Sequence, residues 1–454
     1  MTTSATEPRQ VSDRPNASMS LAESLNLGCA CQTLQPEHLR EQLESLPALK
    51  GLVAQLATSH PHLFSSTAVF VDANTSEQMA QTVRALERVI AQPQWQARAI
   101  AQAPAIAQLD WGPSGVFMGY DFHLAADGPR LIEINSNAGG AILNAALARA
   151  HRACCKAFDG LFDAPETPEA QDDTFVSMFK AEWRSQRAER PLRNILIVDD
   201  APAQQYLAPE FEMVRGMLAA HGLLAVVADP SELQWRDGAL WHPALPGDMP
   251  VDLVYNRLTD FYLQAEEHSA LRTAYEAGAV VLTPHPRTHA LYADKRHLIT
   301  LSDAELLASW GVDQPTLAAL AQTVPATRLV TQENAEALWA QRRSLFFKPS
   351  AGFGSRAAYR GDKLTRRVWG DILAGCYVAQ NLVPPSERMV WVDGETRRLK
   401  VDLRAYTYRG EVQLLAARTW TGQTTNFRTE GGGFSPVVVL PALPVPADNR
   451  CAVA

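Results

Sequence analysis

The alternation of apolar and polar side chains is clearest between residues 115 and 140, where two short segments have a period of two. Each segment has two distinct faces: Tyr120, Phe122 and Leu124 opposite Asp121 and His123, then Ile132 and Ile134 opposite Leu131, Glu133 and Asn135. This period predicts two β-strands, and Asp127-Gly128 between them predicts a hairpin. We expect a three-residue turn, Ala126 to Gly128 with Gly128 left-handed, which sets Asp121 across from Glu133.

The polar face of this hairpin carries groups that could bind a metal ion. Opposed side chains in a hairpin lie about 5 Å apart, and two like charges there are destabilising unless a cation lies between them. Two carboxylates, Asp121 and Glu133, and the Asn135 amide are hard oxygen ligands suited to magnesium. The alternative is a half-solvated hairpin whose polar face only meets water, and these residues alone leave both interpretations open.

The rest of the first 190 residues has mainly helical periodicity. Residues 1–20 are polar without any period and predict a disordered lead. Leucines at three- and four-residue steps then predict an amphipathic helical region broken near Pro47: Leu39, Leu43, Leu46, Leu49, Leu52 and Leu56. A strand at 67–73 precedes a helix that Thr75 and Gln78 would open as a capping box. We therefore expect an N-terminal helical region, residues 21–190, that carries the hairpin.

From residue 191 short apolar runs alternate with helical segments. The runs NILIVDD, LLAVVAD, VDLVYNR and AVVLTP predict buried parallel strands, and hence a small doubly wound α/β domain over 191–290. No glycine triplet follows the first strand, so a dinucleotide fingerprint is absent. Arg257 ends one strand, where such sheets collect ligands, although a plain surface arginine fits the pattern equally well.

The segment after residue 290 carries a lysine and a glycine-rich loop. Asp294-Lys295 lead into a helix, and SLFFKPSAGFGSRAAYRG reads as a strand, Lys348, a glycine loop and a second strand. Glycines let backbone amides approach phosphate oxygens, and Lys348 can supply the counter-charge. The loop is neither a Walker A motif nor part of a kinase signature, and a hairpin turn is the alternative. A long hairpin with Asp402, Arg404 and Arg418 follows, then a Pro-rich tail at 441–454.

Composition narrows the class of protein. At 454 residues, 46% hydrophobic and 20% charged, the chain has an ordinary globular composition with room for two or three domains. A net charge of −8 gives no basic footprint for nucleic acid, and no apolar run is long enough to span a membrane. Nothing at the start resembles an export signal, so we expect a cytoplasmic location. The six cysteines are interpreted as reduced structural thiols.

Taken together, these motifs resemble the ATP-grasp superfamily, and in their order its circularly permuted glutathione synthetase-like members. The family order is a substrate domain, an Asp-Lys helix, a Lys-Pro-Gly loop, a hinge strand, an Asp-x-Arg hairpin, an Asn with glycines, and a metal hairpin. Here the first six occupy residues 190–440 and the metal hairpin precedes them at 119–140. The resemblance implies an α/β (α+β) ATP-grasp fold, with a pre-ATP-grasp domain at 191–290 and the nucleotide-binding region at 291–440.

The resemblance also implies roles for individual residues. ATP phosphates would be held by Lys295 and Lys348 under a glycine loop with Ser350, Gly352, Gly354 and Ser355. The adenine would lie against Gln380, Leu382 and Val383, and the ribose near Glu387. One or two Mg²⁺ ions would be bound by Asp121, Glu133 and Asn135. The transferring phosphate would face Arg404, Arg418 and Asn426, and the substrate Arg257.

Some positions depart from the family pattern. Gly119 stands where many relatives have an arginine, which leaves Arg404 or Arg418 to neutralise the phosphate. Asn381 replaces a common hinge glutamate, and Gly352 stands where eukaryotic glutathione synthetases carry a metal-binding glutamate. The departure at Gly352 puts close kinship with that branch in doubt, but not the fold.

The resemblance implies an ADP-forming carboxylate–amine ligase that works through an acyl-phosphate. Its substrates would be small-molecule or short-peptide carboxylates and amines, and a homo-oligomer is left open. Two alternatives use the same fold: an ATP-binding regulator that has lost ligation, and an ATP-dependent phosphotransferase. Each reading requires segments near 121–135 and 295–426 to line one cleft.

Overall fold

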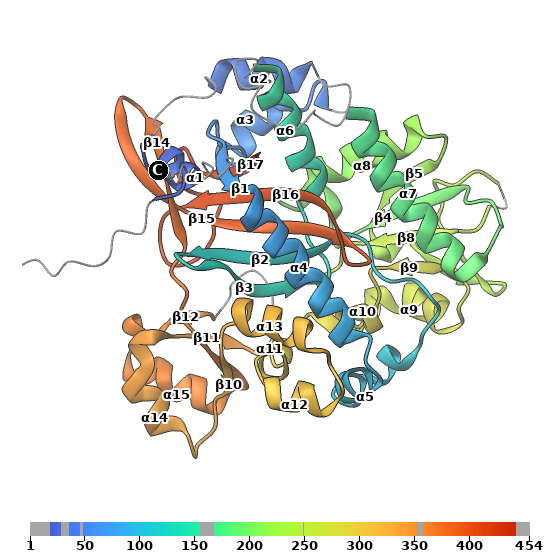
Figure 1. Cartoon of the computed structure of the whole chain (residues 1–454). Coiled ribbons are helices and arrows are strands. Elements are labelled where there is room, and N and C mark those ends of the chain that lie inside the picture. Colours follow the sequence, from blue (N-terminus) through green and yellow to red (C-terminus); the bar gives the residue numbers. More distant parts are fainter. Residues whose placement is uncertain are drawn as a thin grey trace, which may run out of the picture.

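The computed structural model describes residues 19–28, 36–45, 49–154, 168–247, 249–351 and 357–441. Three sheets of four or more strands organise these residues, with helices packed against them (Figure 1). The predicted mixed α/β architecture is confirmed. Strands that are far apart in the sequence belong to the same sheet, and strands that are close in the sequence can belong to different sheets.

The central sheet has seven strands and is built from both ends of the described chain. Its order is β1-β17-β16-β15-β2-β3, and β14 also pairs with β15. The strands are β1 (Val69–Asp72), β2 (Met118–Ala125), β3 (Gly128–Asn135), β14 (Ser386–Val392), β15 (Glu395–Tyr408), β16 (Glu411–Trp420) and β17 (Gly433–Leu440). Since β2 pairs with β15, the early hairpin lies beside a strand nearly 300 positions later along the chain.

The β2–β3 hairpin forms with the expected pairing but a different turn. Ala125 pairs with Gly128, so the loop has two residues where three were predicted, and Gly128 already belongs to β3. A bulge then leaves Ile132 unpaired and restores Asp121 opposite Glu133. The bulge also corrects the predicted faces, because Leu131 lies in the apolar core and Ile132 faces the cavity described below.

Helices cover both faces of the central sheet. α4 (Ala73–Ile90) packs with Leu403 and Ala405 on one face, whereas α6 (Ala141–Cys154) packs with Tyr406 and Ala416 on the other (Figure 1). Alternate residues of a strand point to opposite faces, so the two helices bury both sides of the sheet. The predicted capping box is wrong: α4 begins at Ala73, after an extended Asp72, and Thr75 lies inside it.

The N-terminal helices are short. They are α1 (Leu21–Gly28), α2 (Pro36–Glu44) and α3 (Val53–Ser59), with Pro47 outside the described residues. The helices α5 (Pro93–Ala101) and α7 (Pro168–Arg187) follow. Leu39, Leu43, Leu49 and Leu56 are buried against α6 and its neighbours, as their spacing predicts.

A parallel four-stranded sheet forms from the predicted apolar runs. Its order is β5-β4-β8-β9, with β4 (Asn194–Val198), β5 (Leu224–Ala228), β8 (Leu253–Asn256) and β9 (Val281–Thr283). The helices α8 (Ala208–Ala220) and α9 (Ser269–Glu276) accompany it, with a small hairpin of β6 (Gln234–Arg236) and β7 (Ala239–Trp241). This doubly wound sheet places Arg257 just beyond the carboxyl end of β8.

A second four-stranded sheet carries Lys348. Its order is β10-β13-β11-β12, with β10 (Thr327–Leu329), β11 (Leu345–Pro349), β12 (Tyr359–Arg360) and β13 (Tyr377–Asn381). The helices α14 (Ala335–Gln341) and α15 (Arg366–Ala374) pack on it. Four short helices lead to it from the parallel sheet: α10 (Pro286–Tyr292), α11 (His297–Leu301), α12 (Ala304–Ser309) and α13 (Gln314–Thr323).

A buried glutamate joins the parallel sheet to the central one. Glu182 of α7 is fully buried and accepts hydrogen bonds from the Ser114 and Gly115 amides at 2.9 and 2.8 Å. It also accepts from the hydroxyls of Thr283, at 2.6 Å, and Tyr408, at 2.9 Å. These four donors satisfy a carboxylate that would otherwise be costly to bury, and they fix the two sheets relative to each other.

Candidate functional site

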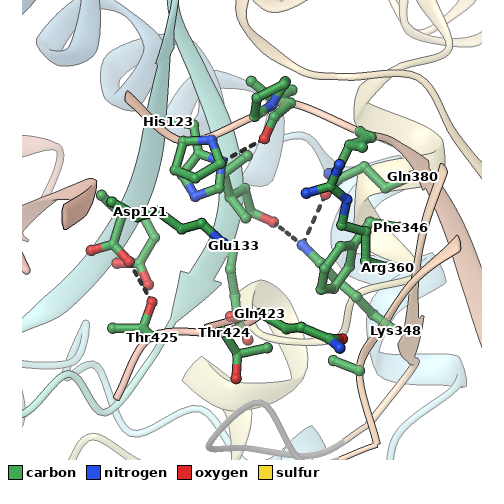
Figure 2. Close-up of a pocket in the computed structure, with 18 of the residues that line it drawn as sticks. Asp121, His123, Glu133, Phe346, Lys348, Arg360, Gln380, Gln423, Thr424 and Thr425 are labelled. Carbon is green, nitrogen blue, oxygen red and sulfur yellow. Dashed lines mark hydrogen bonds between the residues drawn. The ribbon is translucent and has the colours of Figure 1, made fainter. Parts of the chain in front are cut away.

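The first cavity lies between the β2–β3 hairpin, the ends of β15 and β16, and the Lys348 sheet (Figure 2). Its volume is about 250 Å³. Six cationic side chains line it: Lys295, Lys348, Arg360, Lys400, Arg404 and Arg418. Three carboxylates also line it: Asp121, Glu133 and Asp402. The cavity is thus strongly cationic in a chain whose net charge is −8.

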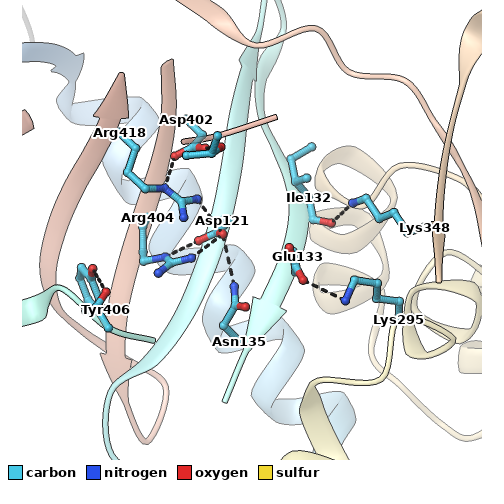
Figure 3. A network of polar contacts seen from close by, with 12 residues as sticks. Asp121, Ile132, Glu133, Asn135, Lys295, Lys348, Asp402, Arg404, Tyr406 and Arg418 are labelled. Atoms are coloured by element: carbon cyan, nitrogen blue, oxygen red, sulfur yellow. Dashed lines mark hydrogen bonds and ion pairs between the residues drawn. The ribbon is translucent and has the colours of Figure 1, made fainter. Parts of the chain in front are cut away.

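Asp121 is held between two arginines on the neighbouring strands (Figure 3). Its Oδ1 accepts from Arg404 Nε at 2.6 Å, and its Oδ2 accepts from Arg404 Nη2 at 2.7 Å and Arg418 Nη2 at 2.9 Å. Asn135 donates to the same Oδ2 at 3.2 Å. Burial alone would raise the pKa of Asp121, but the two guanidinium groups outweigh it and hold that pKa well below its usual range.

Gly119 lies tightly against Ala138 and beside one of these arginines. A Cβ at this position would lie 2.5 Å from the Cβ of Ala138 and 3.4 Å from Cδ and Nε of Arg404. Ala138 therefore fills the space that a side chain at 119 would occupy, and Arg404 lies at van der Waals distance beside it. Many relatives are expected to carry an arginine at the position of Gly119. Here the Arg404 guanidinium from β15 reaches Asp121 instead, two residues further along β2.

Asp402 lies beside Asp121 and shares Arg418 with it. Its Oδ1 accepts from Arg418 Nε at 2.7 Å, and its Oδ2 accepts from the Thr425 hydroxyl at 2.6 Å. Asp402 and Arg418 are register partners on β15 and β16, which explains their proximity. The loop after β16 therefore enters the site through Thr425.

The two predicted lysines both contact the hairpin. Lys295 Nζ lies 3.0 Å from Glu133 Oε1, and Lys348 Nζ donates to the Ile132 carbonyl at 2.7 Å and to Gln380 Oε1 at 2.8 Å. Burial lowers the pKa of Lys348 to about 8, with Glu133 opposing that shift. The expectation that segments near 121–135 and 295–426 line one cleft is confirmed (Figure 3).

Residues 380–383, at the end of β13, close one side of the first cavity. Some of their polar groups already form hydrogen bonds within the protein. The Leu382 amide donates to the Ser344 carbonyl at 2.8 Å, and the Val383 carbonyl accepts from His123 Nδ1 at 2.7 Å. Asn381 also lines the cavity. Gln380 binds Lys348 with its oxygen, and its amide nitrogen is buried without a hydrogen-bond partner among the described residues.

Three predicted residues lie away from the lining of the first cavity. Asn426 binds its own loop, donating to the Thr421 carbonyl at 2.8 Å and accepting from the Arg428 amide at 2.9 Å. Glu387 lies 3.4 Å from Arg398 Nη1 on the half-exposed edge of β14. Ser350 is buried, and its carbonyl accepts from the Lys295 amide at 3.0 Å. Gly352, Gly354 and Ser355 lie outside the described residues.

The second cavity adjoins the first and has a volume of about 320 Å³. Glu133, Asn135 and Lys295 line both cavities. The remaining lining includes Arg257 and Asp199, which follow strands of the parallel sheet, and aromatic side chains from surrounding loops and from α10: Tyr206, Phe261, Tyr262 and His289. A ligand in one cavity can therefore meet a ligand in the other at the polar end of β3.

Arg257 is the buried cation of the second cavity. It donates to the Asn137 side chain and packs over the Tyr255 ring at 5.4 Å, while its Nε has no hydrogen-bond partner among the described residues. Asp199 faces the same cavity, and burial raises its pKa to about 6 despite Arg257 and the Asp200 amide. The pair offers one anion-binding and one cation-binding group to a polar ligand.

Several lining residues were not predicted as site residues. His123 shares the polar face of β2 with Asp121, so its period-two position was a usable signal. Asp402 was noted only as lying near a hairpin end, and its spacing before Arg404 was the signal. Thr425, Trp420 and Asp199 offered none, because they reach the cavities through long-range pairing.

The donor set can be tested for the implied magnesium. No three His, Cys, Asp or Glu side chains converge on a metal position within the described residues. Two carboxylates and an amide do meet at Asp121, Glu133 and Asn135, but arginines and Lys295 already neutralise both acids. A polyphosphate would draw these cations to its own oxygens and free the carboxylates. The residues therefore fit a metal that arrives with a nucleotide.

Comparisons with known proteins were made for the whole chain. No protein-family model and no curated protein matches it. Among solved structures, a glutathione synthetase-like effector from Globodera pallida, in apo form, is similar over 91% of this chain and 100% of its own, with 14% identity and a TM-score of 0.56.

Two further structures are similar over less of the chain. A candidate gamma-glutamylcysteine synthetase from Methylobacillus flagellatus covers 80% of this chain and 87% of its own, with 11% identity and a TM-score of 0.44. The ATP-grasp ligase PsnB, complexed with a minimal precursor, Mg and ADP, covers 54% of this chain and 88% of its own, with 16% identity and a TM-score of 0.28.

At these identities the likeness concerns the fold and not the activity. It rests on the glutathione synthetase-like effector, whose whole length is matched. None of the helices in the described ranges has the length and apolarity needed to cross a membrane. The fold of this chain is similar to that of the glutathione synthetase-like effector.

Proposed function

We propose that this protein is an ATP-dependent, ADP-forming carboxylate–amine ligase. One observation carries the proposal: a cavity lined by six cationic side chains adjoins a second cavity with a buried arginine, and both share Glu133, Asn135 and Lys295. The first suits a polyphosphate, the second a small polar substrate, and reacting groups would meet between them. The second cavity favours a ligase over a regulator that only binds nucleotide.

In this proposal the first cavity binds ATP. Lys295 and Lys348 neutralise the phosphates, and Arg404 with Arg418 stabilise the charge that develops during phosphoryl transfer. Asp121, Glu133 and Asn135 would hold Mg²⁺, which supplies further charge neutralisation when bound. Arg404 and Arg418 are pre-positioned by Asp121 and Asp402, so little reorganisation is needed when phosphate replaces carboxylate as their partner.

The second cavity would hold the carboxylate substrate. Arg257, with its unpaired Nε, binds one acidic group, and Asp199 accepts from a protonated or neutral nitrogen. A small molecule or short peptide with both kinds of group fits this pair. The aromatic lining contacts its apolar part.

The chemistry follows from holding these groups together. Hydroxide is a poor leaving group, so a carboxylate oxygen attacks the γ-phosphorus of ATP and the bond to the β–γ bridging oxygen breaks, giving an acyl-phosphate and ADP. An amine then attacks the acyl carbon and phosphate leaves, while the amine proton passes to solvent or phosphate. The protein contributes positioning and charge neutralisation.

The order of the strands along the chain supports the circularly permuted form of the proposed fold. The β2–β3 hairpin precedes the Lys348 sheet along the chain but pairs with β15, which follows that sheet. We interpret this order as a circular permutation, with the substrate domain at 191–290 and the nucleotide-binding region at 291–440. The cytoplasmic location remains a prediction.

Glu133→Gln tests the proposed function. Glu133 lines both cavities, so losing its charge should lower substrate-dependent ADP release by about a hundredfold or more, with the melting temperature nearly unchanged. The assay measures ADP after ATP and a metabolite extract are added, and mass spectrometry identifies the product. Glu305→Gln, an exposed change on α12, is the control.

The products separate the alternatives. An amide with ADP and phosphate supports the ligase, and a phosphorylated product supports a phosphotransferase. ATP binding without any ADP release supports a regulator. Wild-type turnover in Glu133→Gln would refute the site.

A further inference from the structure

His123 is a polar residue of the first cavity that the proposed chemistry does not use. It lies on β2 two positions beyond Asp121, so its side chain is about 7 Å further along the same face of the strand. Its ring is near Trp420, with centroids 6.4 Å apart. Figure 2 shows it on the hairpin side of the cavity, across from Phe346, Gln380 and Lys348.

The hydrogen bond from His123 fixes which ring nitrogen carries the proton. Nδ1 lies 2.7 Å from the Val383 carbonyl oxygen, and a carbonyl oxygen can only accept. Nδ1 is therefore the donor, and in the neutral ring Nε2 carries a lone pair. Among the described residues the protein uses only Nδ1, which leaves Nε2 as an acceptor in the cavity.

Gln380 supplies the opposite kind of group on the facing wall. Lys348 can only donate, so its contact with Gln380 at 2.8 Å identifies Oε1 as the acceptor and Nε2 as the amide donor. That Nε2 is buried and has no hydrogen-bond partner within the part of the chain that the structure describes. The residues that line the cavity thus include one with a free acceptor, His123, and one with a buried donor that has no partner among the described residues, Gln380.

We propose that His123, with Gln380 facing it, selects the base of the bound nucleotide by accepting a hydrogen bond from an exocyclic amino group. This inference rests on the proposed function, which places a nucleotide in the first cavity. A 6-aminopurine offers an amino donor next to a ring acceptor, which complements His123 Nε2 and Gln380 Nε2. A 6-oxopurine offers the reverse pattern, an oxygen acceptor next to a ring N–H, and leaves both groups unpaired.

Two substitutions of His123 separate a role in selecting the base from a role in holding the Val383 contact. His123→Asn keeps a donor near the position of Nδ1, and so the Val383 contact, but has no atom near Nε2. His123→Gln places an amide oxygen near Nε2 but loses the Val383 contact. Titration calorimetry with ATP and with inosine triphosphate, which differs by the 6-oxo group, measures the selectivity of each variant.

We expect wild type to bind ATP at least about tenfold more tightly than inosine triphosphate, as the loss of a single hydrogen bond allows. His123→Asn should reduce this ratio to about one, and His123→Gln should retain most of it. His221→Asn, on a partly exposed histidine after α8, should keep the wild-type ratio. Thermal melts of all variants check that they fold.

The outcomes distinguish this inference from the proposed function. A wild type that binds neither nucleotide overturns both. A wild type that binds ATP, with the same ratio in His123→Asn, overturns only the role of His123. Loss of selectivity in His123→Gln with retention in His123→Asn would assign the effect to the Val383 contact and would also overturn it.

Discussion

The two cavities meet at Glu133, Asn135 and Lys295 but differ in how their charges are arranged. In the first, arginines of β15 and β16 neutralise Asp121 and Asp402, and Lys295, in the turn between α10 and α11, neutralises Glu133. In the second, Arg257 Nε has no hydrogen-bond partner among the described residues, and burial raises the pKa of Asp199. Paired charges pre-position groups, whereas unsatisfied charges favour the ligand that satisfies them. The first cavity therefore suits the phosphates of the proposed nucleotide, and the second suits the proposed substrate, whose own groups would pair with Arg257 and Asp199.

Removing the carboxylate at the centre of the first cavity should have the largest effect. Asp121→Ala leaves Arg404 without its bidentate partner in a buried site, so we expect a loss of about 3–5 kcal/mol in unfolding free energy. Binding of ATP with magnesium should also weaken. Urea unfolding and calorimetry measure the two effects.

The same hairpin offers a matched control for that change. Asp127→Ala removes a largely exposed carboxylate that lies 2.5 Å from Arg130 in the turn. We expect a change within about 0.5 kcal/mol. Equal effects of Asp121→Ala and Asp127→Ala would contradict the assignment of Asp121 as the organising charge.

A change confined to the second cavity should separate the two regions. Arg257→Lys keeps the charge but loses the planar, multi-donor geometry. We expect kcat/KM for the carboxylate substrate to fall about 30- to 100-fold through KM, with ATP affinity unchanged. The substrate is the one identified by product mass spectrometry. Arg272→Lys, at an exposed position of α9, is the control. A parallel loss of ATP affinity would mean that the cavities do not act separately.

The smallest effect should come from Asp199→Asn and should depend on pH. The folded pKa of about 6 exceeds the ordinary 3.8, so the native state binds this proton more tightly than the unfolded state. The resulting stability is complete below about pH 4 and is lost as pH rises through about 6. Since asparagine cannot ionise, the unfolding free energy of the variant should rise by about 2 kcal/mol relative to wild type between pH 4 and 7.5.

Urea unfolding across that range measures the difference. Asp237→Asn in the exposed β6–β7 turn should give a flat difference over the same pH values. A flat difference for Asp199→Asn as well would show that Asp199 is not held in its neutral form by burial.

The β2–β3 hairpin shows how much of the structure a local sequence pattern can predict. Period-two alternation predicted both strands and the pairing of Asp121 with Glu133, because side-chain period is a local property of the backbone. The turn was predicted one residue too long, and a bulge at Ile132 compensated. Bulges depend on packing against neighbouring strands, so no local pattern identified this one or moved Leu131 to the core face.

The sequence by itself determined the β2–β3 and β15–β16 hairpins, most helices and the parallel sheet, and it indicated Asp121, Glu133, Lys295 and Lys348 as candidate site residues, because periodicity and residue type are local. Only the tertiary structure decided that Ala138 packs against Gly119, that Thr425 enters the first cavity, and that Asn426 binds its own loop. These outcomes depend on which strands become neighbours in the central sheet. That pairing joins residues nearly 300 positions apart and is set by the burial of both sheet faces together.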